Sequence, residues 1–115
     1  ENVHVVANQL EFNAQEKFSG IREPLIHSLN KHEILLRNFP VFAAIRNRPN
    51  VLLIGDSLDD VGMVEGFPYR HLVKVGFLNE DNHELREHYA KVYDVILTND
   101  APMDSVAEIF SRIST

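Results

Sequence analysis

The sequence contains no cysteine among its 115 residues. Disulfide bonds, thiolate catalysis and cysteine-ligated zinc or iron–sulfur sites are therefore excluded. A chain without cysteine is compatible with a reducing compartment, and we expect a cytoplasmic location. Proline and glycine are also scarce, at five residues each, while 44% of the residues are hydrophobic and 24% are charged. This composition is typical of one small globular domain and not of a disordered or fibrous chain.

Positive charge and long apolar runs are also in short supply. Eleven Lys and Arg residues face 17 Asp and Glu residues, which gives a formal net charge of −6. Nucleic acid polymers and anionic membranes bind concentrated basic surfaces, so we expect neither as a partner. The longest apolar runs, such as residues 51–54, are far shorter than the ~20 residues of a membrane-spanning helix. The chain lacks an initiator methionine and opens on a strand-like Val3–Val6, so we expect it to be a piece of a longer protein.

Short β-branched runs alternate with segments of helical period, a pattern that predicts an α/β fold with a mostly parallel sheet and flanking helices. Buried strands are expected at 51–54 and 71–78, a further strand at 93–97 and a weaker one at 3–6. Helices are expected at 33–46 with a restart at Pro40, and at 59–65, 80–91 and 103–113. Residues 10–26 mix glycine, proline and scattered apolar residues, which indicates a β-excursion or a loop.

The sharpest chemical signal is the sequence Gly55-Asp56-Ser57, which follows the apolar run 51–54 and precedes an acidic helix. The carboxyl ends of parallel strands form the ligand crevice of an open sheet, so Asp56 is expected to face substrates. Asp60, one helical turn further on, can face the same point. Two carboxylates at such an edge suit Mg²⁺, which prefers oxygen ligands. We therefore predict a magnesium site formed by Asp56 and Asp60.

A simpler interpretation of the same residues needs no ligand. Asp56 and Ser57 would form a turn and a helix N-cap, while Asp59 and Asp60 would complement the helix dipole. Both interpretations stay open on the sequence alone. The aromatic residues Phe67, Tyr69, Tyr89 and Tyr93 are expected to belong to the core or its rim and not to a base-stacking platform.

The second signal is Lys31, in the sequence Asn30-Lys31-His32 at the start of the helical segment 33–46. A lysine near a carboxylate cluster can neutralise charge on a bound phosphoryl group. An exposed lysine usually has no function beyond contact with solvent. Lys31 therefore indicates a phosphate site only in combination with Asp56.

These pieces together resemble the C-terminal half of the cytosolic 5′-nucleotidase III family, within the haloacid dehalogenase superfamily of aspartate-nucleophile phosphatases. The resemblance covers residues 3–113. The matching pieces are Val5-Val6-Ala7-Asn8, Leu25-Ile26-His27, Asn30-Lys31-His32, Leu52-Leu53-Ile54-Gly55-Asp56-Ser57, Val75-Gly76-Phe77-Leu78-Asn79 and Tyr93-Asp94-Val95-Ile96-Leu97. The resemblance implies that residues 1–115 are the C-terminal part of a haloacid dehalogenase-like Rossmannoid core.

The resemblance also implies roles for individual residues. Lys31 is expected to contact the phosphoryl group and the nucleophilic aspartate. Asp56 is expected to bind Mg²⁺ directly, with Asp60 acting through water or as an orienting group. Ser57 is expected to order the same loop and to contact phosphate. The implied substrate is a nucleoside 5′-monophosphate, hydrolysed to nucleoside and phosphate through an aspartyl-phosphate intermediate.

The superfamily's nucleophile motif, an Asp-x-Asp-x-Thr sequence after a strand, does not occur in these 115 residues. We therefore expect the nucleophile segment and the base-selecting cap to lie upstream, and this chain alone to be inactive. The missing half, or a second copy of the chain, is the expected partner.

Three alternatives remain at this stage. The chain can belong to another aspartate-nucleophile phosphatase of small metabolites, similar to phosphoserine phosphatase. It can be an inactive fragment or interaction module. A receiver-type signalling domain also combines aspartates, lysine and Mg²⁺, but its lysine follows the acidic residues, whereas Lys31 precedes Asp56.

Overall fold

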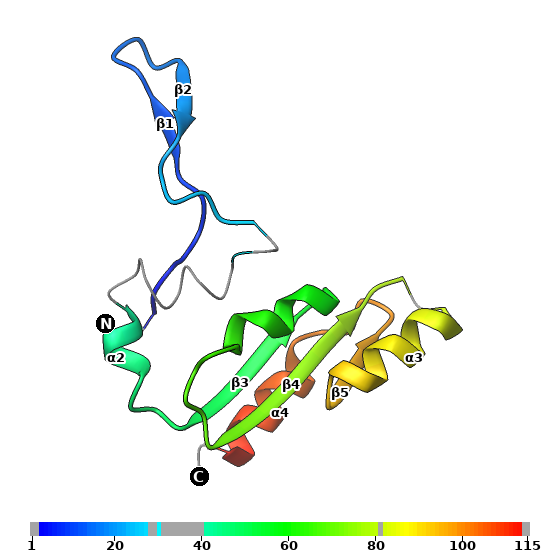
Figure 1. Ribbon diagram of the computed structural model, residues 1–115. Coiled ribbons are helices and arrows are strands. Elements are labelled where there is room, and N and C mark those ends of the chain that lie inside the picture. Colours follow the sequence, from blue (N-terminus) through cyan, green and yellow to red (C-terminus); the bar gives the residue numbers. More distant parts are fainter. Residues whose placement is uncertain (1–2, 28–29, 31–40, 81, 114–115) are drawn as a thin grey trace.

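The structure, a computed structural model, describes residues 3–27, 30, 41–80 and 82–113. It consists of an N-terminal hairpin and a three-stranded sheet with its helices, and the hairpin projects away from the sheet (Figure 1). The Cα radius of gyration is 16.7 Å, larger than the roughly 13 Å of a compact chain of this length.

The sheet contains β3 (Asn50–Gly55), β4 (His71–Leu78) and β5 (Val95–Thr98) in the order β3-β4-β5. Both strand pairs are parallel, so the predicted α/β class with a parallel sheet is confirmed. β5 begins two residues later than predicted because Tyr93 is still the C-cap of the preceding helix.

The central strand β4 carries the best-buried residues of the sheet, Val75 and Leu78. We expected the run 51–54 to be buried on both faces, and this was wrong for β3. Only Leu53 is buried there, and Ile54 is 37% exposed. The reason is that β3 lies at the edge of the described sheet and pairs on one side only.

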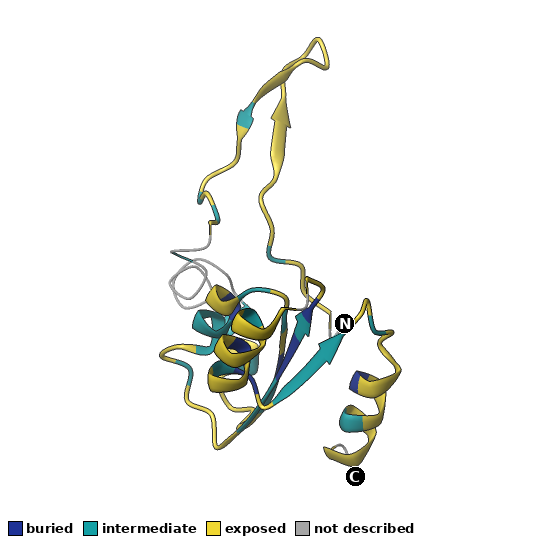
Figure 2. Cartoon of the chain, turned by 90° about the vertical axis from the view of Figure 1, so that its right-hand side faces the viewer, coloured by how far each residue is buried: buried dark blue, intermediate teal, exposed yellow. Residues whose placement is uncertain are grey.

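Helices cover both faces of the sheet. Figure 2 shows α4 (Asp104–Ile113) on one side, with η1 (Leu58–Val64) and α3 (His83–Val92) on the other. The predicted short helix at 59–65 is present as the 3₁₀ helix η1, which at seven residues is longer than most helices of this form. The core on the α3 side joins Leu78, Tyr89 and Tyr93, which confirms the two tyrosines as core aromatics.

The predicted helix at 33–46 is only partly described. Its last turn is α2 (Val41–Ile45), whereas residues 31–40 lie outside the described residues. Among the helices of the described part, none is long and apolar enough to cross a membrane.

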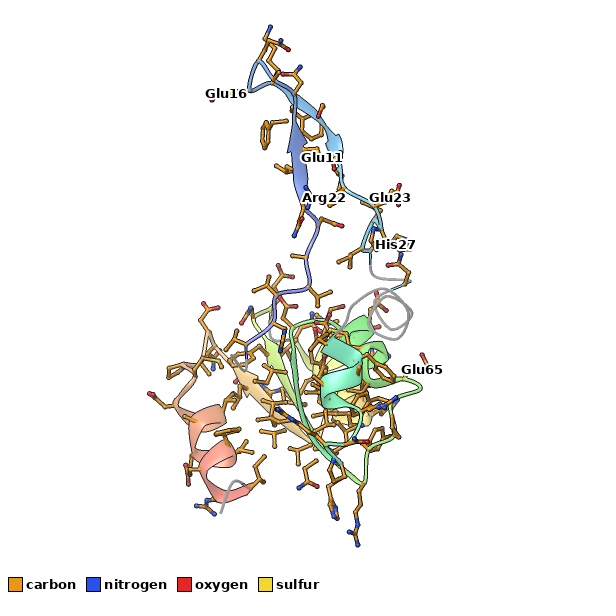
Figure 3. All side chains as sticks on the ribbon, turned by 90° about the vertical axis from the view of Figure 1, so that its left-hand side faces the viewer. Glu11, Glu16, Arg22, Glu23, His27 and Glu65 are labelled. Carbon is orange, nitrogen blue, oxygen red and sulfur yellow. The ribbon has the colours of Figure 1, made fainter. Side chains whose placement is uncertain are left out.

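The N-terminal hairpin pairs β1 (Leu10–Phe12) with β2 (Phe18–Ile21) in antiparallel fashion, which confirms the predicted β-excursion. Beyond the hairpin tip at Glu16, Figure 3 shows Glu11 and Arg22 on facing segments, where Arg22 Nε lies 3.3 Å from Glu11 Oε1.

The prediction of a weaker strand at 3–6 was wrong. Residues 3–6 are extended without a pairing strand in the described part of the chain, and Val3 and Val5 are 70% and 82% exposed. A β-branched run has the propensity for a strand, but it forms one only where a neighbour offers backbone hydrogen bonds.

Candidate functional site

The loop after β3 is organised by a buried carboxylate. Asp60 Oδ2 accepts hydrogen bonds from the backbone N–H groups of Asp56, at 3.0 Å, and Ser57, at 3.1 Å. The Asp60 side chain is only 5% exposed. A buried charge of this kind is tolerated when it is well hydrogen-bonded, so Asp60 and the loop backbone stabilise one another.

The same residues cap helix η1. Ser57 is its N-cap, and the Ser57 Oγ accepts a hydrogen bond from the backbone N–H of Asp59 at 3.2 Å. With Asp60 bonding back to the Ser57 N–H, this arrangement is a capping box. The simpler interpretation from the sequence is therefore right for Ser57 and Asp60 as local structure. The simpler interpretation does not explain the Asp56 side chain, because none of the described residues forms a hydrogen bond with its carboxylate.

Two tyrosines of α3 bind the opposite side of this loop. Tyr89 Oη donates a hydrogen bond to the Asp56 carbonyl at 2.6 Å, and Tyr93 Oη donates to the Ser57 carbonyl. The two rings stack with their centroids 5.4 Å apart and their planes at 28°. Consequently the peptide group between Asp56 and Ser57 is held on both sides, its N–H by Asp60 and its C=O by Tyr89. The peptide groups before and after it are each held on one side, by Asp60 and by Tyr93.

Close approach explains the glycine at the end of β3. A Cβ on Gly55 would lie 2.6 Å from Asp60 Cβ and 2.7 Å from Tyr93 Oη. A side chain at this position would therefore displace the two groups that hold the loop. Gly55 is thus part of the site and not only the end of a strand.

Burial raises the pKa of Tyr93 to about 12, and the carboxylate of Asp60 is the next cause. The pKa of Tyr89 is also raised, first by burial and then by the nearby Asp56 and Asp60. Both phenols therefore stay protonated at neutral pH and act as hydrogen-bond donors to the loop.

The loop opens into a cavity of about 540 Å³ at the carboxyl ends of β3 and β4. This is the edge at which open parallel sheets bind ligands. Asp56 and Asp60 are among the residues that line it, and Asp59 is not. The complete lining comprises Ile54, Gly55, Asp56, Asp60, Met63, Phe77, Asn79 and Met103.

Oxygen donors dominate the polar part of this lining. The carboxylates of Asp56 and Asp60 and the amide oxygen of Asn79 are hard ligands that fit Mg²⁺ and not a soft metal. Within the described ranges no group of three or more His, Cys, Asp or Glu side chains could hold a metal ion. A Mg²⁺ ion here would therefore keep waters or take further ligands from substrate or from other residues, as this ion commonly does.

The predicted residue Lys31 lies outside the described residues. Of the residues before Lys31, 25–27 and 30 are described, and two asparagines form hydrogen bonds to the backbone there. Asn8 forms a pair of hydrogen bonds with the backbone of Ile26, at 2.7 and 2.9 Å. Asn30 bonds to the backbone of His27 and of Leu25, both at 2.8 Å.

Three residues of the site were not predicted from the sequence as site residues, namely Asn79, Tyr89 and Tyr93. Asn79 follows β4 directly, so the rule about carboxyl ends of parallel strands could have identified it. Tyr89 lies in α3, whereas Tyr93 is its extended C-cap and was assigned to the strand predicted at 93–97, so helical spacing did not pair them. The spacing of the tyrosines could not predict that their hydroxyls bond to carbonyl groups of the loop after β3.

Comparisons with known proteins agree on one family. The family model described as "Pyrimidine 5′-nucleotidase (UMPH-1)" matches residues 1–114. The 7-methylguanosine phosphate-specific 5′-nucleotidase of Rattus norvegicus is 35% identical over 113 residues, which cover 97% of this chain and 38% of the rat protein. A putative cytosolic 5′-nucleotidase 3 of Caenorhabditis elegans is 30% identical over 118 residues, covering 99% of this chain and 31% of the relative.

A solved structure shows the same fold. The crystal structure of cytosolic 5′-nucleotidase IIIB bound to cytidine matches with a TM-score of 0.85 and 31% sequence identity, covering 98% of this chain and 38% of that chain. The fold is therefore the haloacid dehalogenase-like α/β arrangement that the family resemblance implied. The chain spans less than two fifths of the length of these relatives, and it belongs to the pyrimidine 5′-nucleotidase (UMPH-1) family.

Proposed function

We propose that the protein containing this chain is a cytosolic, Mg²⁺-dependent 5′-nucleotidase that hydrolyses nucleoside 5′-monophosphates to nucleoside and phosphate. Family membership supports the activity, because the family model and the relatives described above are named as 5′-nucleotidases. The relative named as cytosolic supports the location. The names also support a substrate with a pyrimidine or 7-methylguanine base.

The structural observation that carries the proposal is the position of Asp56. Its carboxylate lines the cavity at the carboxyl ends of the strands, while its backbone is held on both sides. The backbone of the loop is held by several hydrogen bonds, whereas the Asp56 carboxylate has no hydrogen-bond partner among the described residues. This combination is expected of a ligand-binding group.

We assign different roles to the two aspartates. Asp56 would bind Mg²⁺ directly. One oxygen of Asp60 accepts hydrogen bonds from two backbone N–H groups, so Asp60 would act mainly by orienting the loop that carries Asp56. Ser57 would contact phosphate only secondarily, because its Oγ caps η1. Lys31 would neutralise charge on the phosphoryl group.

The chemistry requires a nucleophile from residues outside this chain. An aspartate carboxylate would attack phosphorus, forming an aspartyl phosphate as the ester bond to the nucleoside 5′-oxygen breaks. Water would then cleave the acyl phosphate and release inorganic phosphate. When bound, Mg²⁺ supplies charge stabilisation for the phosphoryl oxygens. The residues of this chain hold and orient, and they neither form nor break the phosphorus–oxygen bonds.

The test compares Asp56→Asn with Asp59→Asn in the complete protein. Asp59 is an exposed neighbour outside the cavity lining, so it is the matched control. Phosphate release is measured with cytidine, uridine and 7-methylguanosine 5′-monophosphates, with Mg²⁺ and with EDTA. We expect Asp56→Asn to lose most of the Mg²⁺-dependent activity, and Asp59→Asn to keep it.

Two results would contradict the proposal. A wild-type protein that releases no phosphate from any of these nucleotides would refute the activity. Full Mg²⁺-dependent turnover by Asp56→Asn would leave the activity in place and refute the role of this loop.

A further inference from the structure

The pair Tyr89 and Tyr93 is more than core packing. Both side chains are buried, at 7% and 4% exposure, and their hydroxyls reach consecutive carbonyls of the loop, those of Asp56 and Ser57. Packing alone requires only the rings. Two phenol hydroxyls that converge on the two peptide groups at a candidate metal ligand form a specific polar contact inside an aromatic cluster.

The helix holds the pair rigidly. Tyr89 lies in the last turn of α3, and Tyr93 caps that helix, with its backbone N–H bonded to the Tyr89 carbonyl at 2.8 Å. The rings also stack on one another. Neither hydroxyl can therefore move far without moving the end of α3.

The sheet beneath is shaped to receive Tyr93. A Cβ on Gly76 would lie 2.6 to 2.9 Å from three atoms of the Tyr93 ring, and a Cβ on Gly55 would lie 2.7 Å from its hydroxyl. The glycines leave the space that the ring and its hydroxyl occupy. The tyrosine, the sheet and the loop therefore fix one another's positions.

We propose that Tyr89 and Tyr93 are positioning residues that set the direction of the Asp56 carboxylate through the carbonyl groups of Asp56 and Ser57. This inference rests on the proposed function, because the carboxylate is useful in that direction only if it binds a metal ion. Loss of either hydroxyl keeps the ring packing and removes the hydrogen bond to one carbonyl group of the loop. The expected consequence is weaker metal binding by an otherwise folded protein.

The experiment uses the complete protein with Tyr89→Phe, Tyr93→Phe and the double variant. Each substitution deletes one hydroxyl and keeps the ring. Tyr69→Phe is the matched control, because Tyr69 is 47% exposed and lies outside the cavity that contains Asp56. Three quantities are measured, namely the Mg²⁺ concentration for half-maximal activity, the KM for the nucleotide, and the melting temperature in EDTA.

We expect each single variant to raise the half-saturating Mg²⁺ concentration about tenfold, as is typical for residues that support a metal ligand. The control should change it by less than about twofold, as expected for a surface substitution. The KM measured at saturating Mg²⁺ should stay close to the wild-type value. The two single variants are independent tests, so the failure of one to fold leaves the other to decide.

The outcomes separate this inference from the proposed function. If the wild-type protein is active and both single variants keep the wild-type Mg²⁺ dependence, the positioning role is overturned while the proposed function stands. A lower melting temperature with unchanged Mg²⁺ dependence overturns it as well, because it shows a purely structural role. An inactive wild-type protein overturns the proposed function and this inference with it.

Discussion

The carboxylate of Asp60 lies 3.0 Å from the backbone nitrogen of Asp56, so one aspartate of the pair holds the other in place. The two residues have opposite environments, because Asp60 is buried and Asp56 is exposed. Their substitution should therefore affect different properties of the protein.

Asp60→Asn should lower the free energy of unfolding by about 1 to 3 kcal/mol, because an amide oxygen can accept the same two N–H groups but lacks the negative charge that strengthens both bonds. Asp56→Asn should change it little, since none of the described residues bonds to that side chain. Urea denaturation of both variants, with Asp59→Asn as the exposed control, measures the difference. Equal stability of all three variants would contradict the structural role of Asp60.

Gly76→Ala should lower the free energy of unfolding by about 1 to 3 kcal/mol through overpacking against the Tyr93 ring. Gly62→Ala is the matched control, because a Cβ there meets nothing within 4 Å. Denaturant titration of the two variants compares the same chemical change at a crowded and at an open position. A Gly76→Ala variant as stable as the control would show that the ring can move away at little cost.

Alkaline pH should destabilise the protein through Tyr93. The folded state raises the pKa of this phenol from 10.0 to about 12, so its contribution is complete below pH 10 and is lost as the pH rises through the folded value. The stability difference between wild type and Tyr93→Phe, measured by urea denaturation, should therefore stay constant up to pH 10 and then shift against the wild type. If the stability difference stayed constant from below pH 10 to about pH 12, this result would contradict the burial of the Tyr93 hydroxyl.

Lys31→Ala in the complete protein should lower kcat roughly 100-fold, the scale of losing one group that stabilises developing charge. Lys17→Ala, on the exposed hairpin turn, is the control and should leave kcat unchanged. Steady-state kinetics at saturating Mg²⁺ and nucleotide provide the comparison. Normal turnover by Lys31→Ala would remove the lysine from the proposed site.

Much of the sheet could be predicted because its signals are local. The apolar run 51–54, stopped by Gly55, has the length and composition of a strand, and the structure places β3 there. The order of elements then made parallel pairing the favoured topology and placed Asp56 at its carboxyl edge. The same local logic failed at Val3 to Val6, where strand formation depends on a partner that the run itself does not specify.

The support of the loop could not be predicted, because it joins distant residues. Tyr89 lies 33 positions after Asp56, and Tyr93 lies 36 positions after Ser57. Helical period applies to Tyr89 but not to Tyr93, the extended C-cap of α3, and it does not say which loop either side chain meets. The exposure of Ile54 is likewise set by the edge position of β3 and not by its own residue type.

Gly55 and Gly76 are direct neighbours across β3 and β4. Two adjacent strands thus lack a side chain on the same rung, and together they form a notch that fits one aromatic ring. We therefore expect positions 76 and 93 to vary together in the family: a member with a residue smaller than tyrosine at position 93 has room for alanine at position 76, whereas a member that keeps the ring is expected to keep glycine there.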